Sequence, residues 1–312
     1  MALAYVSDDI TAKFEVDEAA EIRDLLAGVS IETTPAEADR IDSYAELLAP
    51  LTRVFVTFLP NIDYRDVVRA AAKVRADGMV PVPHIPARTL TGRAELDQFV
   101  DALAGEAGID EALVIGGGLA RPAGDFHCAL QILESGALDR VGVRRIGLAG
   151  HPEGSPDIAP GDARQAIADK NAFARRSDAE FYLVTQFVFE AAPVIAWDKA
   201  LAADGNWLPI VVGLPGCASL KTLIKYAKMC GVGASMRFLT RRASSLAKLA
   251  TVATPDRLIR DLARYRAEDP GAGVAGVHAF PFGAIRRTTG WLNAAADGRF
   301  TLDQKGGFTV EP

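Results

Sequence analysis

Short apolar runs recur along this chain and alternate with helical patterns. The longest, AEFYLVTQFVFE (Ala179–Glu190), is rich in β-branched and aromatic residues and carries the polar pair Thr185–Gln186. An apolar run bounded by polar residues predicts a strand buried on both faces, as in a parallel sheet. The other predicted strands are Val29–Thr34, Arg53–Phe58, Met79–His84 (despite its prolines), Ala112–Gly118, Arg144–Gly150, Leu208–Gly213 and Val274–Phe280.

The stretches between these runs carry apolar residues at helical spacing. The predicted helices are Val16–Ala27, Ala36–Ala49, Asp63–Asp77, Arg93–Ala104, Phe126–Leu133, Asp162–Arg176, Ala192–Ala203, Ser219–Met229, Ser244–Val252, Pro255–Ala267 and Phe282–Asn293. Strand and helix alternate about eight times over roughly 250 residues, which favours one (β/α)₈ TIM barrel. An open doubly wound sheet is the alternative, and the lack of a GxGxxG after the first strand counts against it.

This pattern divides the chain into three parts. We expect an N-terminal arm and helix over residues 1–28, a catalytic α/β barrel over 29–293 and a C-terminal tail over 294–312. The formal net charge of -6 argues against a nucleic-acid-binding protein, which would normally carry a basic patch. The three cysteines form no CxxC pair, the N-terminus lacks a signal peptide, and no run reaches membrane-spanning length. We expect a cytoplasmic protein without a nucleic-acid or membrane partner, and a homo-oligomer is compatible with this.

Polar residues and glycines end the predicted strands. In a barrel these ends converge on one mouth, where active sites lie. The residues so placed are Glu32, Thr57, His84, Gly116, Gly117, Gly118, His151, Glu153, Gln186, the Leu214–Cys217 loop and Phe280.

Glu32 is the first candidate for chemistry. Its apolar neighbours are expected to desolvate the carboxyl, which would raise its pKa and suit a general acid near neutral pH. The alternative is an ordinary partner for a nearby Lys or Arg.

The histidines and glycines at the mouth could each have a functional or a purely structural role. His84, His151 and His278 could form a set of metal ligands, but no HxH or matching carboxylate supports it, so we predict no metal site. The glycine triplet suits either close approach of a flat or phosphorylated ligand, or a plain tight turn.

Several motifs together resemble one family, the methylenetetrahydrofolate reductases. GHPEGSP (Gly150–Pro156) looks like the family's YPEGHP, and VTQFVFE (Val184–Glu190) looks like its ITQFFFD strand. SIETTP (Ser30–Pro35) is similar to SFEFFPP, and PVPHIPAR (Pro81–Arg88) to a PHLTC-type strand. Order and spacing hold from about residue 29 to 293.

The resemblance implies a (β/α)₈ flavoprotein of one-carbon and folate metabolism that serves methionine biosynthesis. It would interconvert 5,10-methylenetetrahydrofolate and 5-methyltetrahydrofolate with NAD(P)H, NADH being favoured. It places Glu32 as the catalytic acid and Gln186 at the pterin and near the nicotinamide. Leu220 and Phe280 fall at substrate positions. The implied cofactor positions are Thr57, His84, Gly116, Gly117, Gly118, His151, Glu153 and Arg175.

Departures from the family pattern concern FAD, its cofactor. The family's RGD triplet reads Gly116–Gly118 here. The tyrosine and the histidine of its YPEGHP motif are His151 and Ser155, and a further tyrosine is Cys128. The LKxK helix that reaches the flavin phosphates reads FARR, so Arg175 is the remaining cation. We therefore predict weak or absent FAD binding and direct hydride transfer between nicotinamide and folate. Alternatives are another folate-dependent barrel enzyme (a lyase or methyltransferase) and a non-catalytic folate-binding protein.

Overall fold

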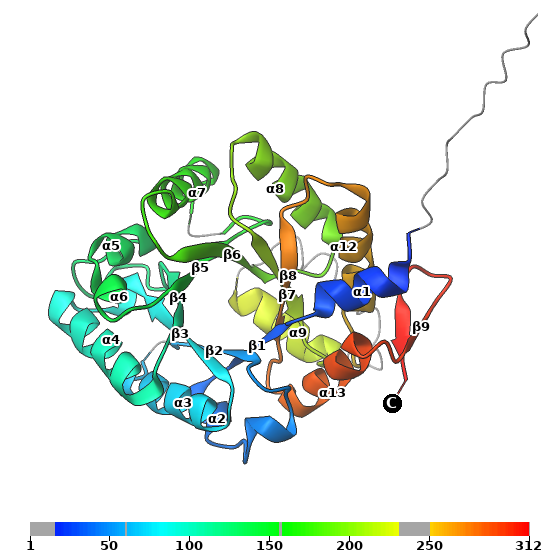
Figure 1. The fold of residues 1–312 in the computed structure, drawn as a ribbon, viewed down its shortest axis with the longest axis horizontal. Coiled ribbons are helices and arrows are strands. Elements are labelled where there is room, and N and C mark those ends of the chain that lie inside the picture. The colour runs from blue at the N-terminus through cyan, green and yellow to red at the C-terminus, as the bar shows by residue number, and fades with distance from the viewer. Residues whose placement is uncertain (1–15, 60, 156–157, 231–249, 312) are drawn as a thin grey trace, which may run out of the picture.

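Parallel strands close into a barrel at the centre of the molecule. The computed structural model describes residues 16–59, 61–155, 158–230 and 250–311. Strands β1 to β8 pair in chain order, and β8 returns to pair with β1, which closes the barrel (Figure 1). The helices form an outer ring around it. The predicted (β/α)₈ fold with an extra N-terminal helix is confirmed.

The element bounds differ from the predicted ones mainly by a few residues. The barrel strands are β1 (Ser30–Thr33), β2 (Arg53–Val56), β3 (Val80–Pro86), β4 (Glu111–Ile115), β5 (Arg145–Gly150), β6 (Glu180–Phe187), β7 (Ile210–Pro215) and β8 (Val274–Phe280). The helices are α1 (Glu18–Leu26), α2 (Pro35–Ala38), α3 (Tyr64–Ala76), α4 (Arg93–Ala107), α5 (Ala129–Glu134), α6 (Ala137–Arg140), α7 (Pro160–Ala174), α8 (Ala191–Ala203), α9 (Leu220–Met229), α12 (Asp256–Glu268) and α13 (Ile285–Ala296). Short 3₁₀ turns occupy Tyr44–Glu46 and Ala87–Thr89.

The proline-containing third strand forms as predicted. Pro81 lies opposite Val54 and Pro83 opposite Val56 in the β2–β3 register. Amides two residues apart in a strand point to the same side, so these two prolines remove donors toward only one neighbour. The other side pairs normally with β4 through His84, Ile85 and Pro86.

Apolar side chains fill the inside of the barrel below the mouth. The buried cluster there consists of Phe55, Val82, Leu113, Tyr182, Val184 and Val211. At the far end the hydroxyl of Tyr182 donates to the buried carboxylate of Glu111, and the guanidinium of Arg145 lies over the Tyr182 ring. The barrel is therefore a packed core, and ligands have access only at its ends.

The segment after β1 departs from the predicted helix over 36–49. Thr34 and Glu37 form a capping box that starts α2, which ends after one turn at Ala38. Tyr44 is fully buried and its hydroxyl donates to Thr33 Oγ1 at 2.8 Å, so the chain turns inward. Tertiary burial of one aromatic side chain overrides the local helical pattern here.

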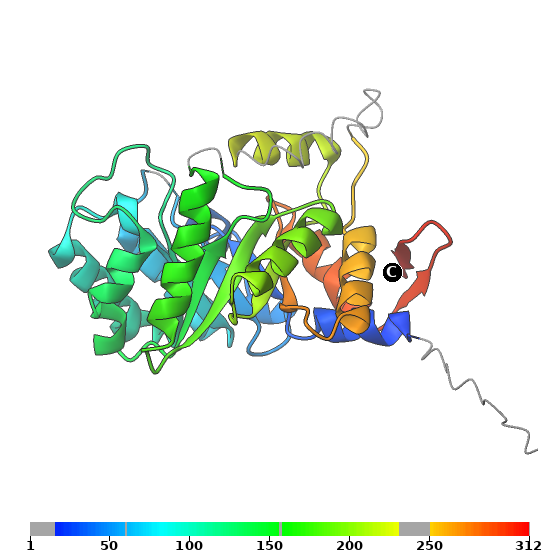
Figure 2. The same ribbon diagram turned by 90° about the horizontal axis from the view of Figure 1, so that it is seen from above.

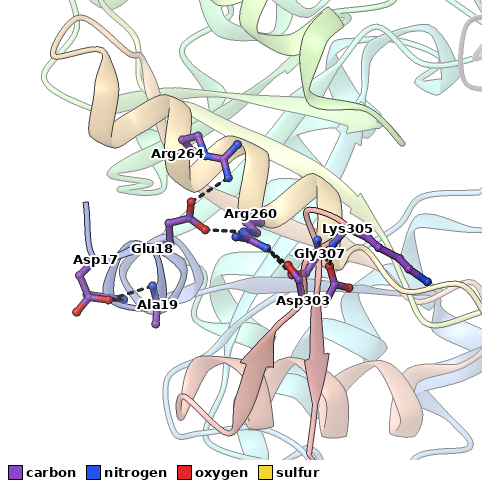
Figure 3. Close-up of polar contacts among 9 residues, drawn as sticks. Asp17, Glu18, Ala19, Arg260, Arg264, Asp303, Lys305 and Gly307 are labelled. Atoms are coloured by element: carbon purple, nitrogen blue, oxygen red, sulfur yellow. Dashed lines mark hydrogen bonds and ion pairs between the residues drawn. The ribbon is translucent and has the colours of Figure 1, made fainter. Parts of the chain in front are cut away.

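Residues 300–310 form a hairpin where a tail was predicted. Strands β9 (Phe300–Leu302) and β10 (Phe308–Val310) pair antiparallel, and the Phe308 ring stacks on Trp291 of α13 at 5.4 Å. Arg260 of α12 donates to the carbonyls of Asp303 and Gly307, and it pairs with Glu18 of α1 (Figure 3). Aromatic burial and these bonds order the segment.

The two ends of the barrel differ in what covers them. α9 lies across the face where the strands end, and α1 lies at the opposite face (Figure 2). Residues 1–15 of the predicted N-terminal arm and most of the predicted helix Ser244–Val252 lie outside the described residues. Within the described ranges, the longest apolar helices fall short of what a membrane crossing requires.

Candidate active site

Glu32 sits between two imidazoles at the mouth. Its Oε2 lies 3.7 Å from Nε2 of His84 on β3 and 3.7 Å from Nε2 of His278 on β8. The side chain of Glu32 is 18% exposed, whereas those of His84 and His278 are 7% and 1% exposed. These are ion-pair distances, longer than full hydrogen bonds. The carboxylate is thus the part of the cluster that a ligand can reach.

Three buried polar atoms beside Glu32 have no hydrogen-bond partner among the described residues. They are Thr57 Oγ1, His84 Nε2 and His278 Nε2. A buried donor or acceptor left unpaired costs about 1–3 kcal/mol, so native proteins keep few of them. Three such atoms around one carboxylate are the mark of a site that binds a polar ligand.

The charge state of Glu32 differs from the sequence-based expectation. Burial on its own raises the pKa of this carboxyl, but His278, His84 and Thr57 together outweigh burial and lower the pKa below its ordinary value. The expectation of a raised pKa was wrong, because it took account of desolvation alone. Glu32 is therefore a carboxylate at neutral pH.

His84 and His278 play different electrostatic parts. Burial lowers the pKa of His84 to about 4, with Glu32 raising it and His278 lowering it further. His84 is therefore neutral at physiological pH. The other ring, His278, is held at Nδ1 by the hydroxyl of Ser30 on β1, 2.9 Å away.

Gln186 lies at an irregularity in β6. The β6–β7 register shifts between Val184 and Phe187, and Gly213 N–H donates to Thr185 Oγ1 at 2.9 Å. The amide oxygen of Gln186 accepts from the backbone N–H of Phe187. Bulges of this kind re-aim side chains next to active sites. A side chain on Gly213 would collide with the Gln186 backbone, 2.8 Å from its Cβ position.

Aromatic and aliphatic side chains form a wall on the β6–β8 side of the mouth. Leu220 of α9 is buried in a cluster with Phe187, and Phe280 and Phe282 pack against that cluster. Phe280 also meets His278 edge-on at 4.8 Å. Phe282 has a φ of 52°, which is uncommon for a residue with a side chain and typical of functional sites. The predicted substrate residues Leu220 and Phe280 thus share one surface.

The glycine loop after β4 is fixed by the turn after β3. Arg88 N–H donates to Gly116 O, and its guanidinium donates to Ala120 O at 2.7 Å. Gly117 has a φ of 87°, so glycine is required there. A Cβ on Gly116 or Gly118 would meet nothing within 4 Å. Packing therefore does not explain the absence of side chains at these two positions.

His151 and Glu153 lie in the turn directly after β5, closed by a bond from Gly154 N–H to His151 O. Burial and the nearby Lys170 lower the pKa of His151 to about 4. Lys170, on α7, is 9% exposed and donates to Ala149 O at 2.8 Å. Burial lowers its pKa to about 8. This lysine was not among the predicted residues.

Arg175 lies away from the mouth, contrary to the expected flavin contact. It is the C-cap of α7, is exposed, and its guanidinium lies over Trp207 at 5.5 Å. A barrel helix runs antiparallel to its strands, so its C-terminal end lies at the opposite face from the mouth. There Arg175 lines a groove of about 710 Å³ between α7 and α8.

The structure brings together Glu32, Thr57 and His84. Of the other predicted residues, Gln186 lies on β6, Phe280 on β8 and Leu220 at the start of α9. Sequence reasoning missed His278 as a partner of Glu32, together with Ser30 and Lys170. The sequence does carry a signal for His278. It lies two residues before Phe280, and side chains two residues apart in a strand face the same side, so both face the same side of β8. Across the described ranges, no three His, Cys, Asp or Glu side chains are grouped so that they could hold a metal ion.

The chain matches no protein-family model. Among solved structures it resembles an uncharacterised protein from Clostridium thermocellum that binds two copies of 5-methyl-5,6,7,8-tetrahydrofolic acid. The identity is 12% and the TM-score 0.51, over 85% of this chain and 97% of that one.

Two further matches have lower TM-scores. Dihydropteroate synthase from Thermus thermophilus matches at 14% identity, with a TM-score of 0.42 over 85% of this chain and 91% of that one. The carboxyl transferase domain of Rhizobium etli pyruvate carboxylase with pyruvate and biocytin matches at 12% and 0.45, over 89% of this chain and 48% of that one. At these identities a likeness shows the fold alone.

Proposed function

We propose that this protein is a folate-dependent oxidoreductase that interconverts 5,10-methylenetetrahydrofolate and 5-methyltetrahydrofolate, with NAD(P)H as its second substrate. The observation that carries the proposal is the half-buried Glu32 carboxylate with unpartnered Thr57, His84 and His278 atoms around it. The Thr185–Gln186 motif and the aromatic wall are further features that support the proposal. That a barrel of similar fold binds 5-methyltetrahydrofolate adds support.

The proposed chemistry needs one proton and one hydride. Opening the five-membered ring of the substrate breaks the bond between its bridging carbon and N10, and N10 takes a proton. The bridging carbon, now an iminium carbon, accepts hydride from C4 of the nicotinamide. Glu32 is the acid–base group of the mouth that lies within reach of a ligand, so we assign it this transfer: the carboxylate takes up a proton from solvent and passes it to N10.

The remaining groups bind and orient. The amide of Gln186 would pair with the polar edge of the pterin, and Leu220 and Phe280 would pack on its rings or on the nicotinamide. These contacts exclude water, which strengthens each polar contact inside the site. They also hold the two reacting atoms near each other, which lowers the entropic part of the barrier.

The residues at the mouth do not fit FAD, the cofactor of the resembled family. Gly116 and Gly118 have no side chain where an arginine and an aspartate would grip the flavin, and the space there is open. Arg175, the cation expected for the flavin phosphates, lies at the opposite end of α7. We therefore propose direct transfer between bound nicotinamide and bound folate, with no step through flavin.

The test combines a spectrum with turnover. We expect a colourless protein that oxidises NADH when methylenetetrahydrofolate is added, with kinetics that require both substrates bound at once. Glu32→Gln should lower turnover by a factor on the order of 10² with folate affinity kept within a few-fold. Glu190→Gln, at an exposed carboxylate beyond β6, is the matched control and should behave as wild type.

Three outcomes would contradict parts of the proposal. A yellow protein that NADH reduces before folate binds would refute the flavin-free route. Folate binding without NADH oxidation would instead support a non-catalytic folate-binding protein or another folate-dependent enzyme. Near-normal turnover of Glu32→Gln would remove Glu32 from the chemistry.

A further inference from the structure

Arg88 is a cation at the rim of the mouth that the proposed chemistry does not use. It lies in the 3₁₀ turn Ala87–Thr89, directly after β3, and His84 of that strand faces Glu32. Its Nη2 donates to Ala120 O, and its Nε is buried without a hydrogen-bond partner among the described residues. Buried donors in native proteins are nearly always paired. An acceptor that arrives with a ligand would complete the bonding of this guanidinium.

The loop beside Arg88 is fixed through backbone atoms. Arg88 N–H donates to Gly116 O, and Arg88 O accepts from Ala123 N–H, both at 2.9 Å. Further along, the backbone at Gly124 lies so close to Thr91 that any side chain would collide with the Thr91 carbonyl. These anchors use no side-chain atom of Arg88 and persist if the guanidinium is replaced. The remaining guanidinium donors are therefore available to a ligand.

The glycines of this loop leave open space beside the cation. Gly117 is required by its φ of 87° and by its closeness to the turn, because a Cβ there would lie 3.2 Å from Pro86. Gly116 and Gly118 have no positive φ, and a Cβ on either would meet nothing within 4 Å. The N–H groups of Gly117 and Gly118 donate to no described residue. Close approach of a ligand to the backbone would account for both open positions.

A cation beside open backbone N–H groups is suited to an anion with several oxygens. The guanidinium is always charged, and its planar fork matches two oxygens of one phosphate. Successive backbone N–H groups of a glycine loop bind further phosphate oxygens. Of the two substrates of the proposed reaction, NADH carries such a group. Its diphosphate lies one ribose away from the ring that gives the hydride.

We propose that Arg88 and the Gly116–Gly118 loop bind the diphosphate of the nicotinamide dinucleotide. This assignment rests on the proposed function and extends it, because it says where the second substrate is held. The strands β3 and β4 are neighbours, so the loop lies beside the strand end that carries His84. His84 in turn lies 3.7 Å from Glu32. A dinucleotide held at the loop extends its ribose and ring toward the Glu32 carboxylate.

Glycine variants test the site without removing Arg88. Gly118→Asp puts a negative charge into the open space, and Gly118→Asn has the same shape without the charge. Fluorescence titration with NADH, without folate, measures the affinity. We expect Gly118→Asp to bind NADH about tenfold or more weakly than Gly118→Asn. Gly105→Asp adds the same charge on the exposed surface of α4, where a Cβ also meets nothing, and should bind NADH as wild type does.

Reduced nicotinamide riboside tests whether the site binds phosphate. This compound has the same ring and ribose and no phosphate, so neither Gly118→Asp nor Arg88→Gln should change its affinity. Arg88→Gln should weaken NADH binding by about tenfold or more. Arg88→Lys should weaken it less, because lysine keeps the charge and loses the fork. Urea unfolding checks that the arginine variants are folded.

Several outcomes would overturn the assignment. Equal NADH affinity of Gly118→Asp and Gly118→Asn would refute it, and so would an equal loss of NADH and riboside affinity in Arg88→Gln. If Gly118→Asp weakened only 5-methyltetrahydrofolate with several glutamates, the loop would bind the carboxylate tail of folate instead. If the variant lost a bound flavin, the loop would hold FAD.

The same titrations separate this assignment from the proposed function. A wild-type protein that binds no NADH would refute both. If NADH binds and the variants behave as expected but no folate is reduced, the diphosphate site stands and the proposed function fails. If folate is reduced and the variants bind NADH as wild type does, the proposed function stands and the site at Arg88 fails.

Discussion

At the scale of single residues, the position of Gln186 depends on how closely the backbone of β7 approaches that of β6. Gly213 of β7 faces the bulge of β6, and its Cβ position lies 2.7 Å from Thr185 O and 2.8 Å from the Gln186 carbonyl. Real Cβ atoms do not approach backbone this closely, so any side chain here would push the two strands apart. The direction of the Gln186 side chain thus depends on a glycine in the neighbouring strand.

Gly213→Ala is expected to damage both stability and the site. Overpacking of a buried position costs typically about 1–3 kcal/mol, and the shift would fall on the Gln186 backbone. Urea unfolding and the KM for folate measure the two effects. Gly116→Ala is the matched control for stability, because its Cβ would meet nothing within 4 Å. Equal stabilities of the two variants would contradict the clearance argument.

The sequence predicted some residues of the site and not their electrostatics. Glu32, Thr57 and His84 could be placed at the mouth because each ends a strand. The lowered pKa of Glu32 could not be predicted, because it depends on His278, which lies 246 positions later in the chain. Only closure of the barrel between β1 and β8 brings the two together.

At the scale of elements, one arginine joins the C-terminal hairpin to the helix α1. Arg260 is 13% exposed at its side chain and bonds Glu18 of α1 and two carbonyls of the hairpin, Asp303 and Gly307. Arg264 supports Glu18 from one turn further along α12 (Figure 3). The contact joins three elements that are far apart in sequence.

Arg260→Ala should loosen the hairpin. Removing it leaves a carboxylate and two carbonyls without this donor, and a hydrogen bond to a charged group contributes about 1.5–3 kcal/mol. We expect a loss of roughly 2 kcal/mol and faster hydrogen exchange at residues 300–310. Arg257→Ala removes one exposed bond, to Lys305 O, and should cost under about 1 kcal/mol. Unchanged exchange in Arg260→Ala would show that aromatic packing alone holds the hairpin.

Element prediction succeeded where burial is continuous and failed where single contacts decide. The apolar runs gave all eight strands because a parallel barrel buries both faces. The helix predicted over 36–49 failed because burial of Tyr44 turns the chain inward. Arg175, expected as a flavin contact, is the C-cap of α7 and lies away from the mouth, whereas Lys170, within the same helix, reaches Ala149 at the end of β5.

At the scale of the whole molecule, buried histidines make stability depend on pH. Burial lowers the pKa of both His84 and His151 to about 4, from 6.5. Between these pH values the two histidines bind protons in the unfolded chain but not in the folded protein. The free energy of unfolding therefore falls as pH drops from about 6.5 to 4. The pKa of Glu32 is lowered from 4.5, so its contribution is lost only below that pH.

Urea unfolding at pH 7.5 and 5.0 checks this dependence. Each pH unit is worth about 1.4 kcal/mol for one fully shifted group, so we expect a loss of roughly 2–4 kcal/mol for the two histidines. His151→Gln should reduce the loss by about half, since it removes one of them. His127→Gln, at an exposed position, should leave it unchanged. Equal stability at both pH values would contradict the inferred burial of neutral imidazoles.

The bond between Ser30 and His278 has a consequence for how the protein acquires its activity. The two residues are 248 positions apart and lie on the first and last strands of the barrel. Contacts of such separation pay the full entropy of closing the chain and form late in folding. A folding intermediate that has most of its helices and strands but an open seam between β1 and β8 would lack the contact between Glu32 and His278. Recovery of turnover should therefore lag behind recovery of secondary structure during refolding.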